Sequence, residues 1–296
     1  MKKKVIASLL IGSVALLSAG DFNAQAEKDR KALQEYLEKK FADRKNANAF
    51  FPYSTKEELD KNYKWGIKGD DFRLGSYAYN IGGKKQYEEM NEMPPYEDAV
   101  DAGKELYEKE KGIKECFPDP AIAGDYPKFV KGKGVVTLSK AVVACAKKNN
   151  LKGWKLTKGK TAKLEAYFAS VSKEKGKKVN IVIDSKEAAE AYERGKKEYY
   201  TQRGYLKLSC ATCHVQGAGQ RVRNEYLSPL TGATTHFPVY RLKWQGLGTL
   251  ERRIKGCNKN QGETPHKPGS AWTSELLYFM AYMSNGMPVD GPDIRK

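Results

Sequence analysis

Five consecutive residues, Cys210-Ala211-Thr212-Cys213-His214, have the spacing C-x-x-C-H. This spacing is the attachment signature of c-type haem. Two thiols add to the two vinyl groups of the porphyrin, and the adjacent histidine is placed to ligate the iron from one face. We therefore expect the surrounding chain to enclose a covalently held haem. The alternative, a zinc or thioredoxin-type site, lacks a second ligand pair and a nearby βαβ pattern.

The first 26 residues have the organisation of a secretory signal peptide. A basic head, Met1–Lys4, precedes an apolar run of 13 residues, and Ala24-Gln25-Ala26 supplies small residues of the A-x-A cleavage type. The apolar run is shorter than the roughly 20 residues that a spanning helix needs, and no later segment is long and apolar enough to cross a membrane. We predict that residues 1–26 are removed and that the protein is periplasmic. An uncleaved anchor is the alternative.

The chain is strongly basic, with 53 Lys and Arg against 36 Asp and Glu and a net charge of +17. Removal of the leader takes away three lysines and one aspartate, which leaves +15. Such an exported protein attracts anionic lipid, acidic proteins or anionic substrates. We do not expect nucleic acid as a partner, because the chain shows no basic run with a nucleic-acid motif. The roughly 270 remaining residues suffice for two domains.

The three other cysteines have no haem motif around them. Cys116 and Cys145 lie 29 residues apart, and a structural disulfide is the default expectation in an oxidising compartment. By the loop-entropy model, a bridge of this span stabilises the fold by roughly 3–4 kcal/mol. Cys257 is then the odd thiol, which in an exported protein forms an intermolecular link or serves as a functional sulfur.

Two parts of the chain repeat the same order of features. A Gly-Lys segment precedes a cysteine, and an aromatic amphipathic segment closes each half: 101–107, Cys116 and 164–171, then 193–200, Cys210 and 276–283. In the second copy, Ser185 supplies a helix start, and Gly195 lies on a face where it allows another helix to cross closely.

This order resembles that of a class I cytochrome c domain. We therefore predict a mostly α protein with two tandem cytochrome c-like domains, at residues 96–180 and 181–296. The first domain is predicted to carry no haem, since neither a histidine nor a second cysteine follows Cys116. A disulfide from Cys116 to Cys145 partly replaces the haem there as a crosslink. Two unrelated helical domains are the alternative.

Residues 27–95 form an N-terminal extension in this interpretation. The charged, Ala-rich segment 27–48 predicts a helix, and Ser54-Thr55-Lys56-Glu57 resembles a capping box that opens a short one. Residues 65–97 are rich in Gly, Tyr, Asn and Pro, and we expect irregular structure there. The sequence does not indicate a function for residues 27–80.

The residues alone leave the second axial ligand of the iron open. The candidates are His236, His266, Met280, Met283, Met287 and Cys257. Methionine would raise the reduction potential and suit plain electron transfer, and Met287 is the best placed of the methionines. Methionine on the closing helix is more often core filler, and histidine in polar loop sequence is by default exposed.

Cys257 differs from the other candidates in its surroundings, because Arg252, Arg253 and Lys255 lie within five residues of it. Nearby cations favour the thiolate and lower the thiol pKa. They would also hold a small dianion, and arginine does this best through its paired donors. The alternative is that the cations form a solvated helix end and that Cys257 is buried packing.

Together, the single C-x-x-C-H and the later stretch LERRIKGCNKNQG resemble the SoxA family, the A subunits of the periplasmic SoxAX cytochrome of sulfur oxidation. The resemblance covers roughly residues 80–296, and Arg253-x-x-x-Cys257 is its most specific part. Many members carry two haems. This chain lacks the first haem motif and resembles the monohaem branch, in which a disulfide stands where that haem would be.

The resemblance implies an L-cysteine S-thiosulfotransferase that joins thiosulfate to a cysteine of the carrier protein SoxYZ and releases two electrons. Cys257 would be the distal haem ligand and the sulfur that becomes a persulfide intermediate. Arg253 would bind thiosulfate, and Lys255 would add to the field that attracts the anion. One haem c would be held by Cys210 and Cys213, with His214 on its iron.

The implied partners are the SoxX cytochrome subunit, as a heterodimer, the carrier SoxYZ and a downstream cytochrome c. With one haem in each subunit, a SoxAX complex would have two one-electron acceptors for the two electrons.

Two other functions fit parts of the pattern. A plain electron-transfer cytochrome, with Met287 or a histidine as distal ligand, needs neither Arg253 nor Cys257. A haem-based sensor would use Cys257 as a ligand that small molecules displace.

Overall fold

The structure is a computed structural model, and it describes residues 21–43, 55–222 and 225–295. Residues 1–20 of the predicted signal peptide and the end of the helix predicted over 27–48 lie outside the described residues. Within the described ranges, no helix has the length and apolar character needed to cross a membrane.

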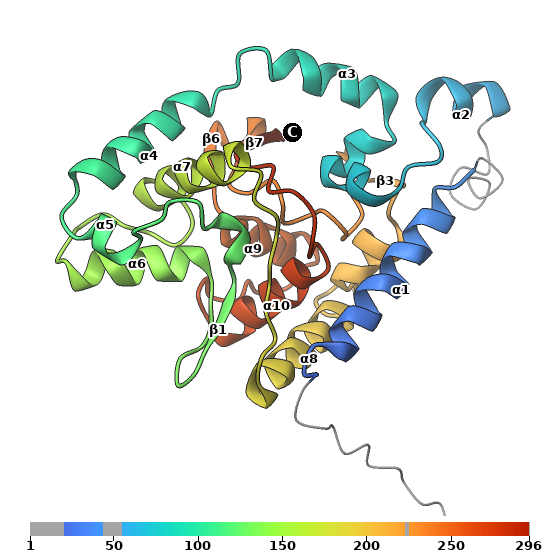
Figure 1. Ribbon diagram of the computed structural model, residues 1–296. Helices are drawn as coiled ribbons and strands as arrows, with labels where there is room; N and C mark the ends of the chain where they lie inside the picture. Colours follow the sequence, from blue (N-terminus) through green and yellow to red (C-terminus); the bar gives the residue numbers. More distant parts are fainter. Residues whose placement is uncertain (1–20, 44–54, 223–224, 296) are drawn as a thin grey trace, which may run out of the picture.

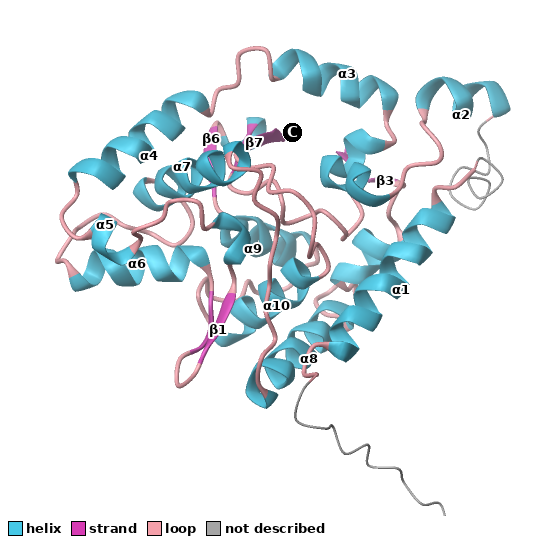
Figure 2. Ribbon diagram, viewed as in Figure 1, coloured by secondary structure: helices cyan, strands magenta, loops and turns pink. Residues whose placement is uncertain are grey.

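The chain is mostly helical, with a few short strands (Figures 1 and 2). Its α-helices are α1 (Ala24–Lys40), α2 (Lys56–Asn62), α3 (Ile81–Met90), α4 (Glu97–Lys109), α5 (Ile113–Cys116), α6 (Leu138–Lys148), α7 (Lys160–Glu174), α8 (Lys186–Tyr200), α9 (Leu250–Asn260) and α10 (Ala271–Tyr282). Short helical turns are η2 (Gly69–Ala78), η3 (Ala123–Asp125), η4 (Thr212–Gln216) and η5 (Leu242–Trp244). The strands are β1 (Lys128–Val130), β2 (Gly134–Val136), β3 (Arg221–Val222), β4 (Glu225–Tyr226), β5 (Val239–Arg241), β6 (Gly246–Gly248) and β7 (Asp293–Arg295).

Both halves contain the helix crossing that the repeat predicts. In the second half α8 packs on α10, and a Cβ added at Gly195 would lie 2.0 Å from the carbonyl oxygen of Glu275. In the first half α4 packs on α7, and a Cβ at Gly103 would lie 2.1 Å from the carbonyl oxygen of Lys163. Only glycine allows these backbones to approach so closely. This glycine-mediated helix crossing, present in both halves, supports two copies of one cytochrome c-like arrangement.

The first half has a small core of its own. Its buried residues are Tyr107, Ile113, Phe117, Val142, Cys145, Leu164 and Phe168. A disulfide joins Cys116 at the end of α5 to Cys145 in α6, the pair expected from the cysteine count. The crosslink therefore lies at the side of this core, where it ties two helices together.

The strands form small sheets rather than a layer of the fold. β1 pairs with β2 as a hairpin, and β3 pairs with β4. In the second half β5 pairs antiparallel with β6 and parallel with the C-terminal β7, where Val239 faces Gly248 and Asp293 respectively. This three-stranded sheet ties the chain end to the segment before α9.

The N-terminal extension packs mainly on the second half. In Figure 1 α1 runs beside α8. Asp29 accepts hydrogen bonds from the Tyr192 hydroxyl at 2.9 Å and from Lys196 Nζ at 2.5 Å. The buried α1 residues Leu33 and Leu37 belong to the same hydrophobic core as α8 and α10. The extension is thus part of the haem-motif half rather than a separate unit.

Two expectations for the extension need correction. Residues 65–97 are not irregular, because they contain η2 and α3; the Asn80 side chain accepts from the Gly83 N–H and caps α3 instead of marking a loop. The capping box also lies one residue later than expected. Thr55 accepts from the Glu58 N–H, and the Glu58 carboxylate accepts from the Thr55 N–H. α2 consequently begins at Lys56.

Candidate functional site

The haem motif begins in a local turn that its own side chains fix. The Thr212 hydroxyl accepts from the Ser209 N–H at 3.1 Å, and the Ser209 hydroxyl accepts from the Thr212 N–H at 3.0 Å. The chain then runs into η4, a π-helical turn that contains Cys213 and His214. Cys210 and Cys213 are free, half-buried thiols. Wide π-turns recur at functional sites, and this one begins two residues after Cys210 and presents Cys213 and His214.

His214 is oriented by the loop that follows the motif. Its Nδ1 lies 2.7 Å from the carbonyl oxygen of Ser228. Because a carbonyl oxygen only accepts, Nδ1 donates to it, and Nε2 is the ring nitrogen left to face a metal. Histidines that ligate metals are commonly held in this way by a second hydrogen bond. The residue thus fits an axial ligand of a haem iron.

Cys257 lies next to the haem motif, although 43 residues separate it from His214 in the sequence. Its thiol is within hydrogen-bonding reach of the His214 side chain. α9 carries Cys257, and Arg253 lies four residues earlier on the same helix face. The spacing Arg253-x-x-x-Cys257 therefore brings one guanidinium beside one sulfur.

Competing effects set the acidity of the Cys257 thiol. Its burial raises the pKa, but the Arg253 charge, the hydrogen bond and charge of His214, and the Arg241 charge lower it more. The net result is a pKa of about 7, below that of an ordinary thiol. A large fraction of Cys257 is then thiolate at neutral pH, which suits metal ligation and nucleophilic attack.

The other two cations of the RRIKGC stretch have different surroundings. The Arg252 guanidinium lies 4.2 Å from the centroid of the Trp244 ring, and its Nη1 donates to the Leu247 carbonyl oxygen. Lys255 is exposed, and a spacing of two residues puts it off the face that Arg253 and Cys257 share. The structure therefore gives no support to a Lys255 contribution.

Arg241 is a cation of the site that the sequence analysis missed. It is buried in β5, its Nη2 donates to Glu225 at 3.2 Å, and its Nε has no hydrogen-bond partner among the described groups. β5 pairs with β6, and β6 leads directly into α9. This pairing brings Arg241 close enough to Cys257 for its charge to lower the pKa of the thiol. The only local sign of such a role in the sequence was a single arginine at the end of a short apolar segment.

The remaining ligand candidates have other environments. Met280 and Met283 are buried in the core of the second half, and Met287 lines a cavity near α1 with Arg30 and Gln34. His266 donates to Glu263 at 3.1 Å and stacks on Trp272. His236 is buried, and burial together with the Arg295 charge lowers its pKa well below the usual value. Cys257 is the candidate that the structure brings to His214.

Zinc gains no support from the described part of the chain. There, no three His, Cys, Asp or Glu side chains are grouped as a metal cage. Cys210, Cys213, His214 and Cys257 instead offer two thiols at the haem-attachment spacing and two further donor side chains. This donor set fits a haem c, which provides the four equatorial nitrogens itself.

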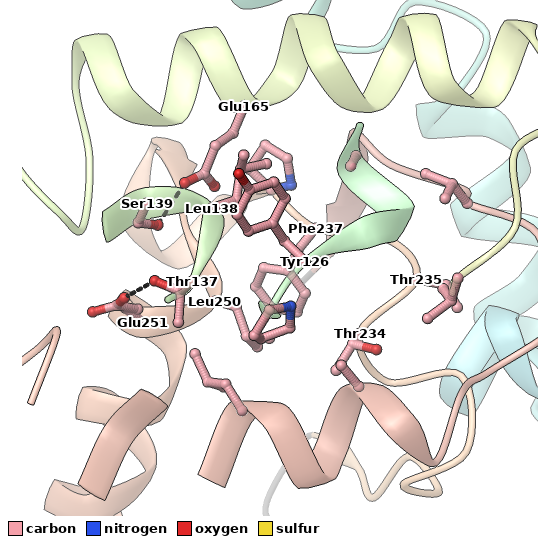
Figure 3. A pocket seen from close by; sticks show the side chains of 17 residues that line it. Tyr126, Thr137, Leu138, Ser139, Glu165, Thr234, Thr235, Phe237, Leu250 and Glu251 are labelled. Carbon is pink, nitrogen blue, oxygen red and sulfur yellow. Dashed lines mark hydrogen bonds between the residues drawn. The ribbon is translucent and has the colours of Figure 1, made fainter. Parts of the chain in front are cut away.

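The first half holds the start of α9. The Glu251 carboxylate accepts from the Thr137 hydroxyl at 2.6 Å, and the Thr249 hydroxyl donates to the Leu156 carbonyl oxygen at 2.7 Å. Figure 3 shows the first of these bonds at the edge of a cavity of about 80 Å³. Across the cavity, the Ser139 hydroxyl donates to Glu165. The helix that carries Cys257 is thus anchored at the joint between the halves.

Comparisons with known proteins agree with this arrangement. Residues 194–289 match the family described as SoxA/TsdA, cytochrome c domain. The chain is 39% identical over 311 residues to the L-cysteine S-thiosulfotransferase subunit SoxA of Chlorobaculum tepidum, and the match covers all of both chains. It is 34% identical to the SoxA subunit of Allochromatium vinosum, over 99% of this chain and 98% of that one.

A solved structure shows the same fold. The crystal structure of SoxXA from P. pantotrophus matches with a TM-score of 0.61 and 27% sequence identity. The match covers 72% of this chain and 84% of that chain.

Proposed function

Because the chain belongs to the SoxA family of L-cysteine S-thiosulfotransferase subunits, we propose that it couples thiosulfate to a cysteine of the SoxYZ carrier, with Cys257 as the catalytic sulfur. It is an enzyme subunit of the sulfurtransferase class, built on a c-type cytochrome fold. The observation that carries the proposal is the grouping of Cys257, His214 and Arg253 from two separate segments.

We assign one haem c to this chain. Cys210 and Cys213 would hold it covalently, and His214 and Cys257 would ligate its iron. When bound, the haem supplies a one-electron acceptor directly at the Cys257 sulfur. The first half has a disulfide at Cys116 rather than a second haem motif, which supports a single haem.

Arg253 is proposed to bind thiosulfate. Its guanidinium offers paired N–H donors to the sulfonate oxygens, and its i, i+4 position directs the outer sulfur of the anion toward Cys257. Gly256 favours this approach, because a Cβ added there would meet nothing within 4 Å. A sulfur–sulfur bond would form between the outer sulfur of thiosulfate and the Cys257 sulfur as two electrons leave, and the carrier thiolate would then take over the thiosulfate group and release the Cys257 thiolate.

The net reaction balances with two electrons. A sulfur–sulfur bond forms between thiosulfate and the carrier cysteine, the S–H bond of that cysteine breaks, and one proton and two electrons are released. The family supports SoxX as the partner subunit, in a heterodimer such as the SoxXA complex of P. pantotrophus. A downstream cytochrome c would take the electrons, and the predicted signal peptide supports a periplasmic location for the reaction.

The substitution Cys257→Ala tests the proposal. We expect loss of thiosulfate-dependent carrier modification, measured by the mass of the SoxYZ cysteine peptide, while the intact mass still shows one haem. Lys255→Ala serves as the matched control on the same helix and should keep full activity. Full activity of the Cys257→Ala protein would instead show that Cys257 is not the catalytic sulfur.

A further inference from the structure

The turn that contains His214 is held from outside by the last residue of α1. Lys40 Nζ donates to the carbonyl oxygens of Val215 at 2.9 Å and Gln216 at 2.5 Å. The Lys40 side chain reaches these atoms from a buried position, with 8% of the residue exposed. Burial lowers its pKa to about 8, so most of the ammonium is charged at neutral pH.

A cation is well suited to this place. The last carbonyls of a helical turn have no partner within the turn and carry partial negative charge. A lysine that donates to two of them satisfies both groups with charge-assisted hydrogen bonds. η4 ends at Gln216, so Lys40 closes the turn directly after the haem motif.

A second contact reaches His214 through the loop on its other side. The Ser76 N–H donates to the Ser228 hydroxyl at 3.0 Å, and the Ser228 carbonyl oxygen accepts from His214 Nδ1 at 2.7 Å. The Tyr79 hydroxyl donates to the neighbouring Leu227 carbonyl oxygen at 2.9 Å. The η2 segment therefore supports the peptide group that orients the imidazole.

The two contacts belong to one packed unit. Phe41, directly after Lys40, stacks on Tyr79 with the ring centroids 5.0 Å apart. The Phe41 ring lies 3.1 Å from the position of a Cβ on Gly219, in the loop between Val215 and Leu227. The extension thus contacts the chain directly after His214 and again at Leu227.

We propose that the N-terminal extension forms the outer wall of the proximal haem site, with Lys40 and Ser76 as positioning residues for His214. The inference rests on the proposed ligation of the haem by His214. Lys40 fixes the backbone that follows the imidazole, and Ser76 fixes the carbonyl that sets its tautomer and ring angle. Residues 27–80, whose sequence indicates no function, thereby help to set the properties of the iron.

The substitution Lys40→Met, examined in the haem-loaded protein, tests this inference. We expect altered electron paramagnetic resonance g-values of the ferric haem, because the imidazole orientation changes. We also expect a lower midpoint potential, because a positive charge close to the iron is lost. Lys39→Met removes the same charge from an exposed position on the same turn, and should leave both quantities unchanged.

Two further variants keep the test decisive. Lys40→Arg retains the charge and two donors, and should restore most of the wild-type spectrum. Ser228→Ala removes the acceptor of the Ser76 N–H but keeps the carbonyl that binds His214, and should shift the g-values by a smaller amount. Wild-type g-values and potential in both Lys40→Met and Ser228→Ala would overturn the inference, even if the unfolding temperature fell.

The outcome is separable from that of the proposed function. Failure of the transferase proposal appears as unchanged activity in Cys257→Ala, whereas the Lys40 variants report on the opposite axial ligand. The spectra of the Lys40 variants can therefore change, or not, whatever reaction Cys257 performs.

Discussion

At the scale of single residues, helix spacing decides which cation acts on Cys257. The sequence predicted three basic neighbours, but only Arg253 shares the face of α9 that carries the sulfur. Arg252 stacks on Trp244 instead. The roles proposed for Cys210, Cys213 and His214 come from the sequence, because haem attachment follows a fixed local spacing. Arg241 was not readable, since it reaches the site from a different strand.

Loss of Arg253 should weaken thiosulfate binding. In Arg253→Met we expect the kcat/KM for thiosulfate to fall about 10- to 100-fold, since a hydrogen bond to a charged group contributes about 1.5–3 kcal/mol. Steady-state kinetics with reduced-cytochrome absorbance measure this. Lys255→Met removes a charge two residues away and should leave kcat/KM within about twofold, because exposed charges interact weakly. Equal losses in both variants would point to a diffuse field instead of a defined anion site.

At the scale of the elements, glycines serve two different purposes. Gly195 allows two helices to pack closely, whereas Gly256 leaves open space beside Cys257. The sequence predicted the α8 crossing at Gly195, because a glycine interrupts an otherwise apolar helix face. The sequence did not predict η2 and α3, because Gly and Asn occur both in irregular loops and at the ends of helices. Local composition therefore identified the helices with strong periodicity and missed those fixed by tertiary contacts.

Two alanine substitutions should have opposite effects on stability. Gly195→Ala places a Cβ 2.0 Å from the Glu275 carbonyl oxygen and should cost about 1–3 kcal/mol of unfolding free energy. Gly256→Ala meets nothing within 4 Å and should add about 0.5–1 kcal/mol through helix propensity. Denaturant titration of the haem-loaded protein measures both.

The same Gly256→Ala protein also tests access to the sulfur. We expect its thiosulfate coupling rate to fall although its stability rises, because the methyl group occupies space beside Cys257. An unchanged rate would show that the substrate approaches from another side.

At the scale of the whole molecule, the two halves share one functional helix. The repeat and the disulfide were predictable, because both are recorded in spacings along the chain. The joint was not predictable, because Thr137, Leu156 and Glu251 meet only after both halves have folded.

The disulfide should stabilise the half that contains it. Replacing Cys116 and Cys145 together by serine should lower the unfolding free energy by about 2–4 kcal/mol, from the entropy of the opened loop. Denaturant unfolding with and without reductant measures the change. Reductant should affect the wild type but not the double variant, and equal stability of the two proteins would contradict the expectation.

Glu165 should make stability depend on pH. Burial is the main cause that raises its pKa to about 8, so between its unfolded pKa, near 4.5, and pH 8 the folded state holds a proton that the unfolded state has lost. Its contribution to stability is therefore present at low pH and is lost as the pH rises toward 8.

The substitution Glu165→Gln tests this titration. We expect a higher melting temperature than wild type at pH 9 and a similar one at pH 5. Glu174→Gln, at the exposed end of the same helix, should match wild type at both values. A Glu165→Gln protein with an unchanged pH profile would show that the carboxyl is already charged in the folded state.

The anchoring of α9 has a consequence for how such a chain can change over evolution. Removal of the first half would leave the Glu251 carboxylate and the Thr249 hydroxyl without their partners. The first half is consequently needed as scaffolding for the helix that carries Cys257. Substitutions should therefore be rarer at Thr137 and Glu251, which join the two halves, than at the exposed positions of the first half.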